Sequence, residues 1–154
     1  MMKDLMNLFP RRNKRSKHIG AALVEFTISV SLLFVLMFGI IEVGLLFKNQ
    51  ATISQAAREA SRSASLGSTV SVCKTRAINT STVTLTTADI ALDKSADAGV
   101  TWSTLGDNGT ATANNGAVGN LVRCTVTYAS PLVSSYIFSG TTRTITAKVV
   151  MNHE

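Results

Sequence analysis

The longest apolar segment of the chain runs from Ala21 to Phe47 and contains only two ionisable residues, Glu25 and Glu42. As an α-helix this segment would be about 40 Å long, whereas the hydrocarbon core of a bilayer needs about 20 helical residues. The uncharged stretch between the two glutamates, residues 26–41, is shorter than the hydrocarbon core requires. We therefore expect the two glutamates near opposite edges of the membrane. The pattern therefore predicts one membrane-spanning helix over residues 21–47.

The polar segment that follows should continue this helix. From Lys48 to Leu66 the sequence is rich in Ala, Gln, Glu and Arg and contains neither Gly nor Pro, a composition that favours helix. Gly67 is the expected end. We predict a single helix over 21–66 that continues outside the membrane.

One face of this extension carries an alanine at every fourth position. Such a stripe would let helices approach closely, or the alanines are present simply as good helix formers. These alanines are Ala56, Ala60 and Ala64. Three larger side chains, Ile53, Leu66 and Trp102, are expected in a protein core rather than in a ligand site.

After Ser68 the composition changes to Thr, Ser and Val with clusters of Gly and Asn. We predict an exported β domain over 67–154, with a small antiparallel sheet. The predicted strands are Thr82–Thr87, Asn120–Tyr128 and Thr142–Met151. The segment Leu105–Asn120 should be a loop or a long hairpin tip.

Alternation along two of these strands predicts which side chains face the core. The overall prediction is an α+β fold in which a long N-terminal transmembrane helix is followed by a small antiparallel sheet. The core-facing residues should be Val122, Cys124, Val126 and Tyr128 in one strand and Ile145, Ala147 and Val149 in the other.

Most of the net charge of +6 lies before Gly20, where six basic residues accompany one acid. A basic block directly before an apolar run predicts a cytoplasmic N-terminus and an exported C-terminus. Residues 1–20 are accordingly expected to be a basic cytoplasmic leader. Because no basic patch with interleaved aromatic residues follows, we do not expect nucleic-acid binding. The residues expected to set the orientation are Arg11, Arg12, Lys14, Arg15 and Lys17.

A secretory signal peptide would have a shorter apolar segment, followed by a small-x-small cleavage site, and none follows Phe47. A plain signal anchor fits the apolar run but leaves Glu25 unexplained. A charge close to the membrane costs on the order of a few kcal/mol. The carboxylate of Glu25 therefore either reaches the headgroup level or has a partner, whereas Glu42 is expected to be interfacial.

The sequence lacks the residue patterns typical of catalysis and metal binding. His18 and His153 have no Cys, Asp or Glu at metal-ligand spacing. There is no nucleophile-elbow motif and no phosphate-binding glycine loop. The segment Asp107–Gly109 is expected to be a turn rather than a calcium loop. We expect no enzyme activity, no cofactor and no metal site.

Both cysteines, Cys73 and Cys124, fall in the part predicted to be exported. In a periplasmic or extracellular compartment a disulfide between them is expected. Such a disulfide would close a loop of about 50 residues and would stabilise a domain with a thin core by about 4 kcal/mol. Two buried free thiols are the alternative.

The segment GAALVEF, from Gly20 to Phe26, resembles the class III signal of type IV prepilins. A glutamate followed by an aromatic residue is similar to the Flp, or tight-adherence (Tad), branch. The downstream GLLF and AAREASR segments, and the closing TYASPL and TITAKVV strands, resemble the TadE-like family of pseudopilins. The resemblance is strong over Gly20–Ser65, weak from Ser68 to Asn120, and moderate thereafter.

This resemblance implies cleavage between Gly20 and Ala21 by a membrane aspartic prepilin peptidase. Cleavage would leave a new ammonium group on Ala21. Glu25, followed by Phe26, would then pair with that amine or with the amine of a neighbouring subunit during assembly. Many other type IV pilins begin with Phe at the mature N-terminus, whereas this chain has Ala21, so methylation of the amine stays open.

The function implied by the resemblance is that of a TadE-like minor pseudopilin in assembly of the Flp/Tad type IVb pilus, for adhesion and biofilm formation. Its expected location is the bacterial inner membrane, crossed once. The expected partners are the membrane, a prepilin peptidase, other pilins and pseudopilins, and the Tad assembly machinery. The alternative is an uncleaved single-pass anchor whose outer domain binds an extracytoplasmic ligand.

Overall fold

A computed structural model describes residues 15–110, 112–133 and 142–154 of the chain. The chain divides into two compact units, Met1–Ile40 and Ile41–Glu154. The described part of the first unit consists of helix. The second unit contains the remainder of that helix, a shorter helix and a four-stranded sheet.

Helix α1 extends over Arg15–Ser65, a length of 51 residues, which confirms the predicted long helix. It begins before the predicted start at Ala21, so the backbone is already helical at Gly20. Its end is a Schellman motif: the Gly67 N–H donates to the Ala64 carbonyl, and the Ser68 N–H donates to the Ser63 carbonyl, both at 3.1 Å. Gly67 adopts a φ of +79° that favours glycine, which explains why the helix ends there.

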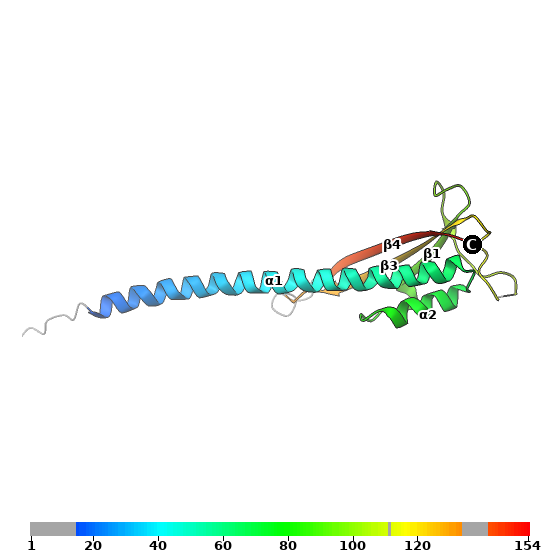
Figure 1. Cartoon of the computed structure of the whole chain (residues 1–154). Helices are drawn as coiled ribbons and strands as arrows, with labels where there is room; N and C mark the ends of the chain where they lie inside the picture. The colour runs from blue at the N-terminus through cyan, green and yellow to red at the C-terminus, as the bar shows by residue number, and fades with distance from the viewer. Residues whose placement is uncertain (1–14, 111, 134–141) are drawn as a thin grey trace, which may run out of the picture. The chain divides into compact units, whose positions relative to one another are not determined.

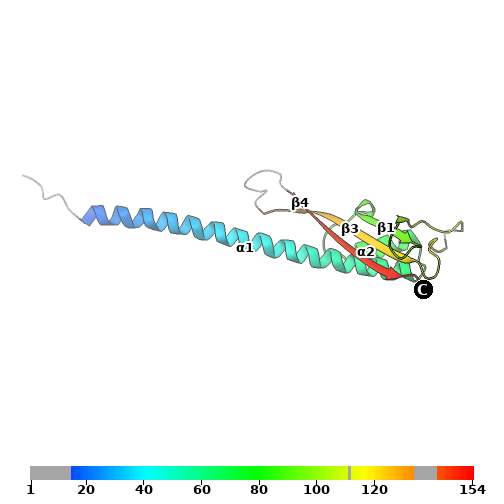
Figure 2. The same cartoon turned by 90° about the horizontal axis from the view of Figure 1, so that it is seen from above.

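The second unit contains the predicted antiparallel sheet, with strand order β2-β1-β3-β4. The two long strands, β3 (Leu121–Pro131) and β4 (Thr142–Asn152), pair along their whole length and confirm the two strands predicted in those regions. Strand β1 (Ile90–Ser95) pairs with the other side of β3, and the short β2 (Ser103–Thr104) completes the sheet. Figures 1 and 2 show β3 and β4 as neighbouring long strands.

The face of the sheet that is buried is the one that the alternation predicted. Val122, Cys124 and Val126 are fully buried, and Tyr128 is half-buried beside them. On β4, Ala147 is buried, with Ile145 and Val149 partly buried on the same face. This face packs against residues of α1 and of α2 (Val70–Thr80), which together form one core. That core includes Ile53, Ala57, Ala77, Leu85, Ile90, Leu92 and Leu105.

Two predictions for the segment after Gly67 are wrong. Thr82–Thr87 is not a strand: it begins with a bend and leads into a short 3₁₀-helix, η2 (Thr87–Asp89), and β1 follows it. In addition, the part predicted to be a β domain contains helix α2. Its Val- and Thr-rich sequence has a weak helix propensity, which is offset by capping and by burial of Cys73 and Ala77.

The N-terminus of α2 is held by two side-chain acceptors. The Thr69 hydroxyl accepts a bond from the Val72 N–H at 3.4 Å, as an N-cap residue does. A carboxylate oxygen of Asp107, from the loop between β2 and β3, accepts from the Val70 N–H at 2.7 Å. A negative charge at this end also favours the helix dipole.

Of the three large side chains expected in a core, only Ile53 is fully buried. Leu66 is 58% exposed, so that prediction is wrong: it lies in the turn that ends α1, beyond the helix face that packs on the sheet. Trp102 is half-buried and lies under the side chain of Arg123, outside the core cluster.

Candidate processing and assembly segment

Gly20 lies inside helix α1, in a place where the fold does not require glycine. A Cβ added to Gly20 would meet nothing within 4 Å, and its φ is not in the left-handed region. Glycine inside a helix costs about 1 kcal/mol relative to alanine. No close packing among the described residues offsets this cost, so packing gives no reason for a glycine at this position.

Glu25 is exposed on α1, five positions further along the chain. The nearby hydroxyl groups donate hydrogen bonds to the helix backbone. Thr27 Oγ1 donates to the Leu23 carbonyl and Ser31 Oγ donates to the Thr27 carbonyl, both at 2.8 Å. An ionised carboxylate has no proton to donate in this way. Within the described part of the chain, Glu25 makes no hydrogen bond and no ion pair.

The apolar side chains around Glu25 are also uncovered, and Phe26 is 66% exposed. Among the described residues one helix, over Gly20–Ser65, is long and apolar enough to cross a membrane, and its most apolar window has no buried residue. Exposure of so much apolar surface in water would be unfavourable by about 25 cal/mol per Å². The segment therefore needs lipid or other helices around it.

The residues predicted to set the membrane orientation cannot be placed. Arg11, Arg12 and Lys14 lie outside the described residues. Arg15 and Lys17 lie in α1, but their side chains are outside the described part as well. The orientation therefore stays a prediction.

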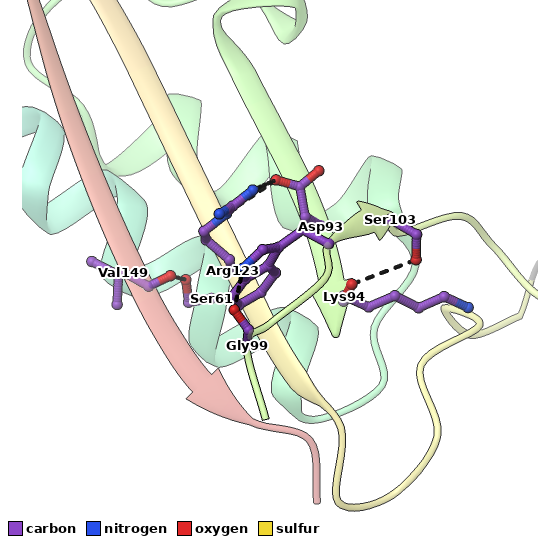
Figure 3. Close-up of polar contacts among 8 residues, drawn as sticks. Ser61, Asp93, Lys94, Gly99, Ser103, Arg123 and Val149 are labelled. Carbon is purple, nitrogen blue, oxygen red and sulfur yellow. Dashed lines mark hydrogen bonds and ion pairs between the residues drawn. The ribbon is translucent and has the colours of Figure 1, made fainter. Parts of the chain in front are cut away.

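The alanine stripe lies in the core of the second unit. Ala56, Ala60 and Ala64 are fully buried in the cluster shared with α2 and the sheet. Ser61, on the same part of α1, donates a hydrogen bond of 3.1 Å to the Val149 carbonyl of β4 (Figure 3). Small side chains here let α1 approach the domain of its own chain closely.

The open face of the sheet carries one polar cluster that the sequence did not reveal. The Arg123 guanidinium lies 4.1 Å from the centre of the Trp102 ring and donates to the Asp93 carboxylate at 2.7 Å. The indole N–H of Trp102 donates to the Gly99 carbonyl at 3.1 Å. Figure 3 shows these contacts joining β3, β1 and the connection between β1 and β2. The pairing of Asp93 opposite Arg123 in the register brings the two charges together.

Cys73 on α2 and Cys124 on β3 are both fully buried and are free thiols in the structure. Burial, and to a lesser extent the neighbouring Cys73, raises the pKa of the Cys124 thiol to about 12. Burial also raises the pKa of Cys73 above its usual value. Because the thiolate is the reactive form, both groups are unreactive near neutral pH in the folded protein. The predicted disulfide stays a prediction, and its alternative is the state seen here.

The loop between β2 and β3 supplies a second feature that the sequence analysis missed. Its Asn114 is buried against the end of α1, where its side-chain amide donates to main-chain carbonyls. His153 is buried beside it, with Nε2 at 3.0 Å from Asn114 Oδ1. The Asn-Gly clusters of this loop indicated a turn, and no pattern in them signalled a buried amide.

Comparison with known proteins identifies one part of the chain. Residues 20–62 match the model of a family described as TadE-like protein. No curated protein and no solved structure matches the chain. The matched stretch contains the GAALVEF segment with Gly20 and Glu25, and the AAREASR segment (residues 56–62), which carried the resemblance in the sequence. That resemblance is confirmed over residues 20–62, where the chain is similar to the TadE-like family.

Proposed function

We propose that the chain is a TadE-like minor pseudopilin that takes part in assembly of the Flp/Tad pilus, for surface adhesion and biofilm formation. A prepilin peptidase would cleave it between Gly20 and Ala21. The apolar part of α1 would then hold it in the bacterial inner membrane, with its N-terminus cytoplasmic and its C-terminal domain exported. The observation that carries the proposal is Glu25: an exposed carboxylate in an apolar helix that has no partner among the described residues of its own chain.

The role proposed for Gly20 rests on its lack of a structural one. Glycine presents no side chain that would obstruct a peptidase site, and its backbone leaves the helical conformation more easily than that of any other non-proline residue. Since a Cβ would fit without contact in the folded helix, substitution should impair cleavage much more than folding. The basic residues before Gly20 would keep the leader on the cytoplasmic side.

Cleavage would supply the charge that Glu25 lacks. The new ammonium group at Ala21 lies four positions before Glu25, a spacing at which side chains on a helix are neighbours. In an assembly the ammonium of one subunit can also meet the Glu25 carboxylate of the next. Pairing two opposite charges offsets the cost of placing each of them near lipid and fixes the relative register of the two helices.

Substitution of Glu25 tests this role in assembly. Glu25→Val should leave membrane insertion and cleavage intact but reduce piliation at least tenfold, because an unpaired buried ammonium typically costs several kcal/mol. Glu25→Gln retains the shape and a hydrogen-bonding carbonyl, so its loss should be smaller. Thr27→Val is the matched control, because it removes only a local bond to the helix backbone. The measurements are co-purification of partner pilins and counts of surface pili, with cleavage followed in the same cells.

The alternative, an uncleaved anchor, predicts the opposite effect of Glu25→Val on function. A valine enters a membrane more easily than a glutamate does, so an anchor would retain or gain function in Glu25→Val. Normal piliation in that variant, with normal cleavage, would mean that the carboxylate only reaches the headgroup level and has no partner.

A further inference from the structure

We propose that a groove between α1 and β4 binds the phosphate group of a membrane glycerophospholipid. The groove has a volume of about 270 Å³ and lies within the second unit. Four of the six side chains that line it are apolar, one is an amide and one is a guanidinium. They are Val43, Leu46, Phe47, Gln50, Arg143 and Ile145.

The groove begins where the closed core of the domain ends. There Asn49 Nδ2 donates to the hydroxyl of the fully buried Ser130 at 2.8 Å, and Gln50 Nε2 donates to the Thr146 carbonyl at 3.3 Å. Toward the N-terminus of α1 no further bond between α1 and β4 is found among the described residues. From Gln50 the groove extends along α1 to Val43.

The position along the chain places this groove at the border of the membrane. Val43 and Phe47, which are 52% and 72% exposed, belong to the last turns of the apolar run, and Lys48 follows directly. Apolar side chains this exposed are expected to contact acyl chains rather than water. The end of the groove near Gln50 should then lie at the level of the phosphate groups.

Arg143 gives the groove its charge. It lies on β4 two positions before Ile145 and so shares the face of the sheet that packs on α1. Its side chain is exposed and makes no ion pair or hydrogen bond within the described part of the chain. An arginine binds phosphate through two parallel N–H···O bonds, whereas apolar walls suit the acyl chains of the same molecule. Among the residues that line the groove no acid opposes this charge.

The proposal is tested on the full-length protein, released from phosphatidylglycerol nanodiscs and examined by native mass spectrometry. Wild type should retain phosphatidylglycerol. Arg143→Gln should retain at least fivefold less, and Arg143→Lys, which retains the charge but loses the planar fork, should lie between them. Lys148→Gln is the matched control, because Lys148 is an exposed cation on the same strand but on the opposite face of the sheet. It should stay within twofold of wild type.

Four results would overturn the proposal. The first is equal lipid retention by Arg143→Gln and Lys148→Gln. The second is equal retention of diacylglycerol, which lacks the phosphate, because the groove would then act through its apolar walls alone. The third is displacement of the lipid by millimolar inorganic phosphate, which would indicate a site for the free anion. A dimer that persists in place of bound lipid and is lost in Arg143→Gln would also contradict it, since a second copy would then fill the groove.

Discussion

The side-chain amide of Asn114 donates a hydrogen bond of 2.7 Å to the main-chain carbonyl of Ala64, near the end of helix α1. The same amide nitrogen donates to the Ser68 carbonyl at 3.0 Å, so it bonds two carbonyls at the end of the helix, of which that of Ala64 also accepts from the Gly67 N–H. Its oxygen accepts from the Gly116 N–H at 2.9 Å and lies 3.0 Å from Nε2 of His153. Since that oxygen can only accept, Nε2 of His153 carries the proton. Asn114 thus ties a loop and the C-terminal segment to α1.

Asn114→Ala should destabilise the domain by about 2–4 kcal/mol, because it removes two hydrogen bonds to main-chain carbonyls and the partner of Nε2 of the buried His153. The matched control is Asn152→Ala, whose side chain is exposed at the end of β4; it should change the stability by no more than about 0.5 kcal/mol. Urea unfolding of the two variants measures the difference. Equal midpoints for both would show that the buried amide does not hold the loop.

Ala60→Leu should destabilise the domain by about 1–3 kcal/mol, because Ala60 is fully buried between α1 and the rest of the core. Ala51→Leu adds the same atoms at an exposed position of the same helix and should be nearly neutral. Thermal unfolding compares the two. If Ala60→Leu left stability unchanged and only reduced association with other pilins, the alanine stripe would serve packing between subunits instead.

The stability of the reduced protein should fall as the pH rises above about 9. The unfolded Cys124 thiol ionises near its ordinary pKa of 9.0, whereas burial holds the pKa of the folded thiol at about 12. Between these values the folded state binds more protons than the unfolded state, so stability decreases with pH, by up to about 1.4 kcal/mol per unit for this thiol. Below pH 9 the contribution is fully present. Unfolding curves of wild type and Cys124→Ala over pH 8–11 isolate the effect, and parallel pH profiles would refute it.

Cys73 and Cys124 are expected to be joined in protein recovered from the exported compartment, since thiols there are oxidised. Their raised pKa values make the folded thiols slow to react, so the bond should form before the core closes around them. Mass analysis under non-reducing conditions checks the link. Two free thiols in the recovered protein would establish the reduced state as the native one.

The elements that were predicted correctly are those whose sequence pattern is compatible with only one type of secondary structure. The long apolar helix and the alternation of Val122, Cys124 and Val126 are of this kind, because burial on one face demands that period. Helix α2 could not be predicted, since its propensity is weak and its N-terminus depends on Asp107 from a distant loop. The Asn-Gly loop was recognised as a turn, but its packing was not: a Cβ on Gly116 would lie 2.7 Å from Cδ2 of His153, a contact set only by the folded chain.

For the candidate site too, the local sequence identified residues but not their tertiary packing. Gly20 and Glu25 were identified from a short motif, and the structure adds that a Cβ at Gly20 would meet nothing within 4 Å and that Glu25 has no hydrogen bond or ion pair among the described residues. The alanine stripe was recognised by its spacing, but whether it faced a partner or the chain's own domain depended on tertiary packing. The groove beside Arg143 combines residues nearly a hundred positions apart, such as Phe47 and Ile145, and could not be read from local sequence.

The N-terminus of the protein recovered from cells with an active prepilin peptidase tests the central claim most directly. N-terminal sequencing and intact mass should show that the mature chain begins at Ala21 and lacks the first 20 residues. Gly20→Arg should remain at full length, because the large side chain blocks the peptidase site. Gly39→Val is the matched control: this glycine lies in the same helix, a Cβ there also meets nothing within 4 Å, and the variant should be cleaved as wild type is. A wild-type protein that still begins at Met1 in those cells would contradict the account and leave the uncleaved anchor in its place.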